Sequence, residues 1–90
     1  VEATKLTSRD YPPEAIRAWP RGGRVFVAVR VQLDGRATDC KINRSSGSPG
    51  VDADTCRLVM AKVRFVPARD EQGRPVVDWY GYVQEMTGRW

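Results

Sequence analysis

Hydrophobic and polar residues alternate most strictly between residues 24 and 33. The hydrophobic positions of this run are Val25, Val27, Val29, Val31 and Leu33. The intervening positions are the mixed set Phe26, Ala28, Arg30 and Gln32. A period of two with one apolar face predicts a β-strand that is covered on one side and largely open on the other. Asp34-Gly35 then predicts a tight turn, because glycine adopts positive φ without steric cost.

Residues 36–44 are expected to return as a partner strand, with Thr38, Cys40 and Ile42 facing inward. The polar cluster at residues 45–50 breaks the pattern before a second change of period. From Asp52 to about Lys62 the spacing becomes helical. The residues that share one face of this helix are Asp52, Cys56, Val59 and Val63. Asp52 and Asp54 are expected to act at the helix start, where acids favour the exposed amide donors.

A shorter helix is predicted upstream, from Glu14 to Trp19. Tyr11-Pro12-Pro13 forces an extended entry, because a residue before proline is pushed out of the helical region, and Pro13 suits the first helical position. Downstream, Pro75 opens a last strand that runs to about Gln84. One face of that strand is predicted to carry Val77, Trp79 and Val83, and the other Tyr80 and Tyr82.

The order of elements is therefore helix, strand, strand, helix, strand. We predict an α+β domain in which two helices pack on one face of a three-stranded antiparallel sheet, with the last strand beside the first. Ninety residues make one domain, residues 1–90, with residues 1–9 and 85–90 loosely ordered. The chain starts at Val1 without a methionine, so we expect it to be a fragment of a longer protein.

Cys40 and Cys56 fall on the inward faces of the predicted strand and of the helix that covers it. Two interpretations remain open. A disulfide would tie helix to sheet and would indicate an oxidising compartment; alternatively, both are buried thiols that act as small apolar groups. We favour the disulfide. A metal site is not expected, because two cysteines without any histidine cannot complete a zinc shell.

The chemistry-bearing residues argue against catalysis. The chain has no histidine, the commonest general base near neutral pH, and no glycine-rich phosphate loop. We therefore expect no enzyme activity and no cofactor. The net charge of +4 comes from arginines spread along the chain between acids, which favours a solvated surface over a nucleic-acid interface. No apolar run approaches the roughly 20 residues of a membrane helix.

Several short motifs follow one another along the chain. They are Tyr11-Pro12, Ala15, Gly23 before the valine-rich strand, Asp34-Gly35, Ser45-Ser46-Gly47, Val51-Asp52, Phe65-Val66-Pro67-Ala68 and Gly73-Arg74-Pro75-Val76. Their order resembles the C-terminal domain of TonB, the energy transducer of Gram-negative outer-membrane import. The resemblance covers the chain from Tyr11 to about Tyr82. The two cysteines are not general in that family.

The resemblance implies a periplasmic domain that is anchored in the inner membrane by an N-terminal helix absent from this chain. It further implies work with the ExbB–ExbD complex and binding of the TonB box of outer-membrane transporters by strand addition at the last strand. The partner-binding residues carried over in this way are Asp10, Tyr11, Pro12, Val76, Val77, Asp78, Trp79, Tyr80, Gly81, Tyr82 and Val83.

Two alternatives remain open. Ordinary packing explains the aromatic side chains of the last strand equally well, and packing across the first helix explains Tyr11 equally well. The same fold could also serve a structural or signalling protein of the cell envelope, in which the free strand edge pairs with a second copy to form a homodimer.

Overall fold

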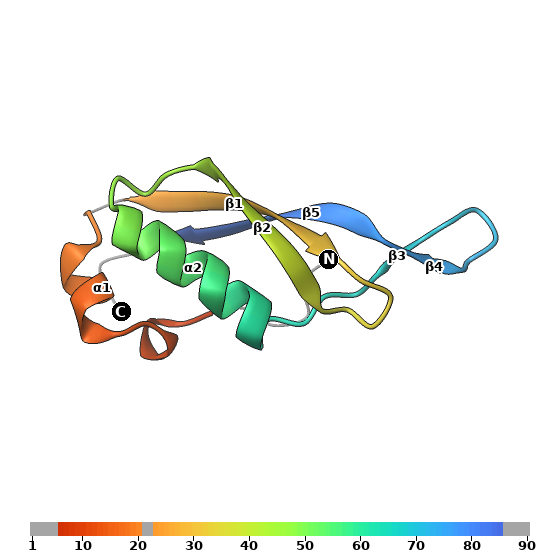
Figure 1. The fold of residues 1–90 in the computed structure, drawn as a ribbon, viewed down its shortest axis with the longest axis horizontal. Helices are drawn as coiled ribbons and strands as arrows, with labels where there is room; N and C mark the ends of the chain where they lie inside the picture. The colour runs from red at the N-terminus through yellow and green to blue at the C-terminus, as the bar shows by residue number, and fades with distance from the viewer. Residues whose placement is uncertain (1–5, 21–22, 86–90) are drawn as a thin grey trace.

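The computed structural model describes residues 6–20 and 23–85 (Figure 1). In chain order the elements are a 3-10 turn η1 (Ser8–Asp10), α1 (Pro13–Ala18), β1 (Arg24–Val31), β2 (Ala37–Arg44), α2 (Pro49–Lys62), β3 (Ala68–Arg69), β4 (Pro75–Val76) and β5 (Asp78–Glu85). The predictions of loose order for residues 1–5 and 86–90 lie outside the described residues. Leu6 is buried, so the part of the N-terminal segment that is described contributes to the core.

The sheet is antiparallel, with strand order β2-β1-β5, so the predicted pairing of the last strand with the first is confirmed. α2 crosses one face of this sheet, and α1 lies beside α2 near its N-terminal end (Figure 1). The core forms between α2 and the covered face of the sheet. Its central residues are Val25, Val27, Val29 and Val31 from β1 and Val51, Leu58, Val59 and Val63 from α2 and its end.

The predicted last strand is divided in two. Pro75–Val76 pairs with Ala68–Arg69 in a separate two-stranded sheet, whereas Asp78–Glu85 pairs with β1. The β3–β4 hairpin projects beyond the main sheet at one end of the molecule (Figure 1). The prediction of a single strand from Pro75 to Gln84 is therefore wrong, because the chain changes its pairing partner at Val77.

Three residues assigned to the covered face are exposed. Leu33 is 55% exposed because β1 ends at Val31 and Leu33 lies in the following turn. Thr38 is exposed because the β1–β2 register shifts next to it, so that Ala37 opposes Val31 and is buried instead. Ile42 opposes Val27 but remains 41% exposed, because it lies on β2, the edge strand of the sheet.

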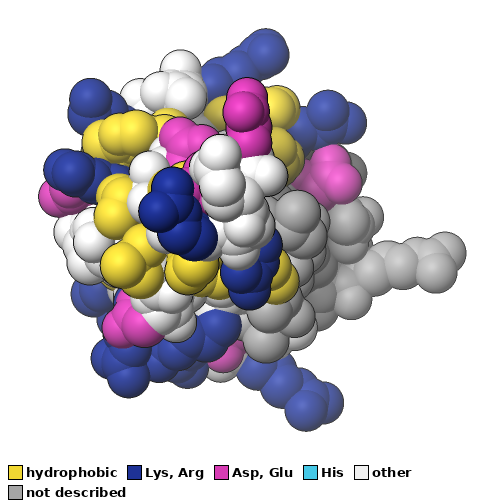
Figure 2. Space-filling model, turned by 90° about the vertical axis from the view of Figure 1, so that its right-hand side faces the viewer, with side chains coloured by type: hydrophobic (Ala, Val, Ile, Leu, Met, Phe, Trp, Pro, Cys, Tyr) yellow, Lys and Arg dark blue, Asp and Glu magenta, His cyan; other side chains and the backbone are white. Residues whose placement is uncertain are grey.

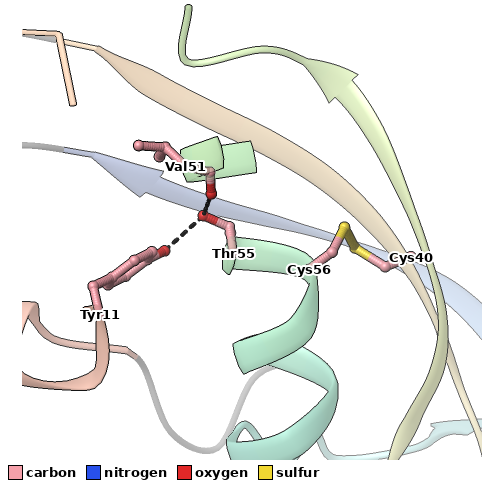
Figure 3. The surroundings of a disulfide bond; sticks show 5 residues. All are labelled: Tyr11, Cys40, Val51, Thr55 and Cys56. Atoms are coloured by element: carbon pink, nitrogen blue, oxygen red, sulfur yellow. Dashed lines mark hydrogen bonds between the residues drawn. A yellow bond between two sulfur atoms is a disulfide. The ribbon is translucent and has the colours of Figure 1, made fainter. Parts of the chain in front are cut away.

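The disulfide between Cys40 and Cys56 is present and joins β2 to α2 (Figure 3). The two Cα atoms are 5.7 Å apart, and 16 positions separate the cysteines in sequence. On α2, Thr55 precedes Cys56 and makes two polar contacts: its hydroxyl donates to the Val51 carbonyl at 2.8 Å and meets the Tyr11 hydroxyl at 2.7 Å. The cross-link and these contacts tie α2 both to the sheet and to the N-terminal segment.

Asp52 lies in the first turn of α2, as predicted, and it also organises the loop before the helix. The helix begins at Pro49 and is capped by Ser48, whose Oγ accepts from the Val51 amide. The buried Asp52 carboxylate instead accepts hydrogen bonds from the Ser45 hydroxyl, the Ser46 amide and the Ser46 hydroxyl. Burial by itself raises the pKa of Asp52, but these hydrogen bonds outweigh it and hold the pKa below its ordinary value.

Replacing Asp52 by asparagine should lower the free energy of unfolding at pH 7 by about 1–2 kcal/mol, because charge-assisted bonds to the loop are lost. A carboxyl with a lowered folded pKa stabilises the fold above its unfolded pKa of about 3.9, and this contribution is lost as pH falls through the folded pKa. Urea unfolding between pH 2 and 7 should therefore show that the free energy of unfolding falls less on acidification in D52N than in wild type. The matched variant D54N removes an exposed pair with Arg57 and should cost at most about 0.5 kcal/mol. If acidification lowers the free energy of unfolding equally in D52N and wild type, the Asp52 carboxylate does not stabilise the loop.

Candidate functional site

The strand β5 forms one edge of the sheet, and among the described strands it pairs with β1 alone. Its register with β1 is unbroken over eight residue pairs, from Arg24 opposite Glu85 to Val31 opposite Asp78. In such a strand every second residue turns its N–H and C=O away from the paired neighbour. β5 therefore offers a regular row of backbone donors and acceptors at its outer side.

The opposite edge, formed by β2, is built differently. Its register with β1 shifts twice, between Phe26 and Val27 and again between Arg30 and Val31. It also carries Lys41 at an exposed position. Bulges and lysines are the features that discourage further pairing at a sheet edge. β5 has neither a register shift nor a lysine or proline, so it is the edge suited to receive another strand.

The inward face of β5 is occupied by the protein's own core. Tyr82 is 1% exposed; its hydroxyl accepts from the Leu6 amide at 2.9 Å and donates to Gln84 Oε1 at 2.6 Å. Tyr80 is half-buried, and its hydroxyl donates to the Val66 carbonyl at 3.0 Å. Because the Tyr82 side chain fills the core, a docking strand could meet only its backbone.

The outward face of β5 belongs to the uncovered side of the sheet. It carries Trp79, Gly81 and Val83, which oppose Arg30, Ala28 and Phe26 on β1. Trp79 is 41% exposed, and the Lys41 ammonium lies 4.8 Å from its ring centroid. Trp79 is therefore the exposed large hydrophobic side chain of β5.

The hairpin before β5 has its polar groups engaged locally. Arg69 donates to the Gly73 carbonyl at 2.6 Å, and Arg74 forms an ion pair of 3.1 Å with Asp70. Val76 is half-buried in β4, whereas Val77 is exposed at the link to β5. Hydrophobic, basic and acidic side chains are mixed over this end of the molecule (Figure 2). The charges visible there do not form a patch of one sign.

The second candidate segment, Asp10-Tyr11-Pro12, lies against the helices. Tyr11 is buried, packs edge-on against Trp19 with centroids 4.9 Å apart, and contacts Thr55 through its hydroxyl (Figure 3). Burial raises the pKa of Tyr11 to about 12. Asp10 forms an ion pair of 3.1 Å with Lys62 at the end of α2. The Tyr11 ring thus contributes to the core, and the accessible part of this segment is Asp10 and the half-buried Pro12.

Two residues near this edge were not among the predicted partner-binding residues. Ala28 and Lys41 share the open face with Gly81 and lie in the same row of paired positions. The alternation of the first strand put Ala28 on the open face. The register that brings Lys41 opposite Ala28 depends on the bulges in β2, for which the sequence carries no clear signal.

Within residues 6–20 and 23–85, no cluster of three or more histidine, cysteine or acidic side chains could hold a metal ion. The same part of the chain has no helix with the length and hydropathy needed to cross a membrane.

Comparison with known protein families shows to which family the chain belongs. The profile described as "Gram-negative bacterial TonB protein C-terminal" matches residues 7–83, which is most of the chain. The chain belongs to the TonB C-terminal family. A search of curated proteins returned no match to the chain.

This TonB-type domain is thus a member of a periplasmic family of Gram-negative bacteria. The family consists of interaction and transduction domains rather than enzymes, and it is associated with outer-membrane receptors. The mixed α+β fold with a three-stranded antiparallel sheet and two helices agrees with this membership.

Proposed function

We propose that this domain binds the N-terminal TonB box of outer-membrane transporters by adding it as a further strand at the outer side of β5. In this proposal the parent protein is anchored in the inner membrane by an N-terminal helix outside this chain. The ExbB–ExbD complex supplies proton-driven energy there, and the domain transmits it to the transporter for nutrient import.

The observation that carries the proposal is the regular, lysine-free edge of β5, in contrast to the bulged edge that β2 forms on the opposite side of the sheet. Each backbone hydrogen bond contributes a net of about 0.5–1.5 kcal/mol. An eight-residue strand turns about four residues outward, so the gross gain is several kcal/mol before the cost of ordering the peptide. Such a balance suits a complex that forms and dissociates readily. The residues around Asp10 and Pro12 are proposed as a second contact.

Amide hydrogen exchange measured by NMR tests the proposal directly. The probe is a synthetic peptide that copies the TonB box of a Gram-negative outer-membrane transporter. With saturating peptide, every second amide between Asp78 and Glu85 should become protected, because those N–H groups acquire partners. Amides of β2 should not change. Protection gained only in the helices or in β2, or no protection at saturating peptide, would overturn the proposal.

The same edge also allows pairing with a second copy of the chain, which is the competing interpretation. Sedimentation of the free domain separates the two. The proposal expects a monomer at micromolar concentration, with β5 amides that exchange at a rate independent of protein concentration. A micromolar dimer whose β5 amides become protected without any peptide would instead favour self-association.

A further inference from the structure

The open face of the main sheet is uncovered in the part of the chain that the structure describes. The other face carries the buried valines of β1 and is crossed by α2 (Figure 1). On the open face, by contrast, none of the paired residues of β1, β2 and β5 is buried. The two outer strands lie about 10 Å apart, close to the diameter of one helix. The open face therefore has the width that a single helix can cover.

Among the paired residues of this face, acidic side chains occur only at its two ends. At one end Glu85 on β5 opposes Arg24 on β1 and forms an ion pair of 2.9 Å with it. At the other end Asp39 on β2 opposes Arg30 on β1, and their charged groups lie 3.9 Å apart. Each acid is thus matched by one arginine.

The two rows between these ends carry cations that no acid neutralises. Lys41 and Arg44 on β2 form no ion pair with another described residue. Both lie over aromatic rings instead. The Lys41 ammonium is 4.8 Å from the Trp79 ring centroid, and the Arg44 guanidinium carbon is 5.8 Å from the Phe26 ring centroid. A ring attracts a cation but accepts few of its N–H donors, which stay available to a carboxylate.

An open hollow lies beside Arg44. It has a volume of about 370 Å³ and is lined by Gly23, Arg24, Phe26, Arg44, Ser45 and Ser46. Pockets that hold small molecules begin at about 300 Å³, so the hollow has room for one side chain of a partner. Two arginines and two serines make the lining mainly polar. The hollow therefore suits an acidic side chain better than an apolar one.

We propose that the open face is a docking surface for an acidic amphipathic helix of a partner protein. Its carboxylates would meet Lys41 and Arg44 in the middle of the face, and its apolar side chains would pack on Phe26, Trp79 and Val83. This inference does not depend on strand addition, because a strand that docks at β5 uses backbone groups at the edge and leaves the face free.

The distribution of charge favours such a helix over a continuous polyanion. A lipid surface or a nucleic acid would also set negative charge against Glu85 and Asp39 at the ends of the face. A helix can place its acids in the middle alone. Its length along the face is matched too, since strands of eight residues extend for about 27 Å, or about five helical turns.

Two synthetic helical peptides test this inference on the intact domain. Both are end-capped, alanine-rich and about five turns long, with leucines along one face. One carries two central glutamates at positions i and i+4 beside the leucines, and the other carries glutamines there. The glutamate peptide should bind about fivefold more tightly, the combined effect of two ordinary surface ion pairs. Added salt should reduce this preference, and binding should shift the indole N–H resonance of Trp79.

The variant K41Q/R44Q should bind both peptides equally. The matched control R17Q/R57Q removes the same charge from exposed positions on α1 and α2 and should keep the fivefold preference. Equal binding of the two peptides to wild type, or an unchanged preference in K41Q/R44Q, would overturn the proposal. Loss of the preference in both variants would show an effect of net charge alone and would also overturn it.

Vesicles of phosphatidylglycerol separate a membrane from a protein partner. If neither peptide binds wild type, the proposal fails. If the vesicles then bind wild type and R17Q/R57Q but not K41Q/R44Q, the face belongs to a lipid surface instead. The TonB-box peptide and the protection of β5 amides are measured independently of these probes, so failure here leaves strand addition intact.

Discussion

Removal of the Cys40–Cys56 disulfide is expected to lower the free energy of unfolding by about 3 kcal/mol, the value for a closed loop of about 15 residues. The cross-link spans 16 positions and connects the edge strand β2 to α2. In a 90-residue domain the total stability is on the order of 5–10 kcal/mol. The loss would therefore be a large fraction of the whole.

The effect should be greatest in β2, since few side chains of this strand are buried. Apart from Ala37, every residue of β2 is exposed or only half-buried, and its register with β1 is interrupted twice. Urea unfolding of C40A/C56A should show the loss, and amides of β2 should exchange faster than those of β1. Wild type in a thiol reductant should match the variant, whereas the variant itself should not respond to reductant. A loss below about 1 kcal/mol would show that packing alone holds β2 to the helix.

The sequence predicts well those elements whose two faces differ strongly. The alternation of β1 places its four buried valines correctly, and the helical spacing of α2 brings Val59 and Val63 to the core. The Asp34-Gly35 turn and the pairing of β5 with β1 follow from the same pattern. In each case, burial of one apolar face decides the structure, and burial is what the spacing of hydrophobic residues records.

Elements that depend on register rather than burial are predicted less well. In β2 the apolar residue Ile42 lies on the correct face and yet remains exposed, and a bulge moves Thr38 away from the core. The split between β4 and β5 depends on pairing with residues 68–69, which no alternation of hydrophobic and polar residues assigns to a strand. The β5 edge was predictable because a last strand that pairs only with the first strand of the sheet leaves its other side open.

Replacing Gly35 by alanine is expected to lower the free energy of unfolding by about 3 kcal/mol, the sum of two separate effects. Gly35 has φ +84°, a region in which alanine costs about 1–2 kcal/mol. In addition, a Cβ at Gly35 would lie 2.3 Å from the backbone carbonyl oxygen of Phe65. To relieve this overlap, the turn must move away from Phe65, which breaks the hydrogen bond of 2.9 Å from the Phe65 amide to the Gly35 carbonyl.

The variant Gly73→Ala measures the first effect alone, and the second then follows by difference. Gly73 also has positive φ, +80°, but a Cβ there meets no atom within 4 Å. Thermal and urea unfolding of G73A should therefore show only the conformational cost of about 1–2 kcal/mol. The excess loss in G35A measures the contact between the β1–β2 turn and Phe65, the residue that leads from α2 toward the β3–β4 hairpin. If the two variants lose the same stability, the close approach of Gly35 to Phe65 does not constrain the fold.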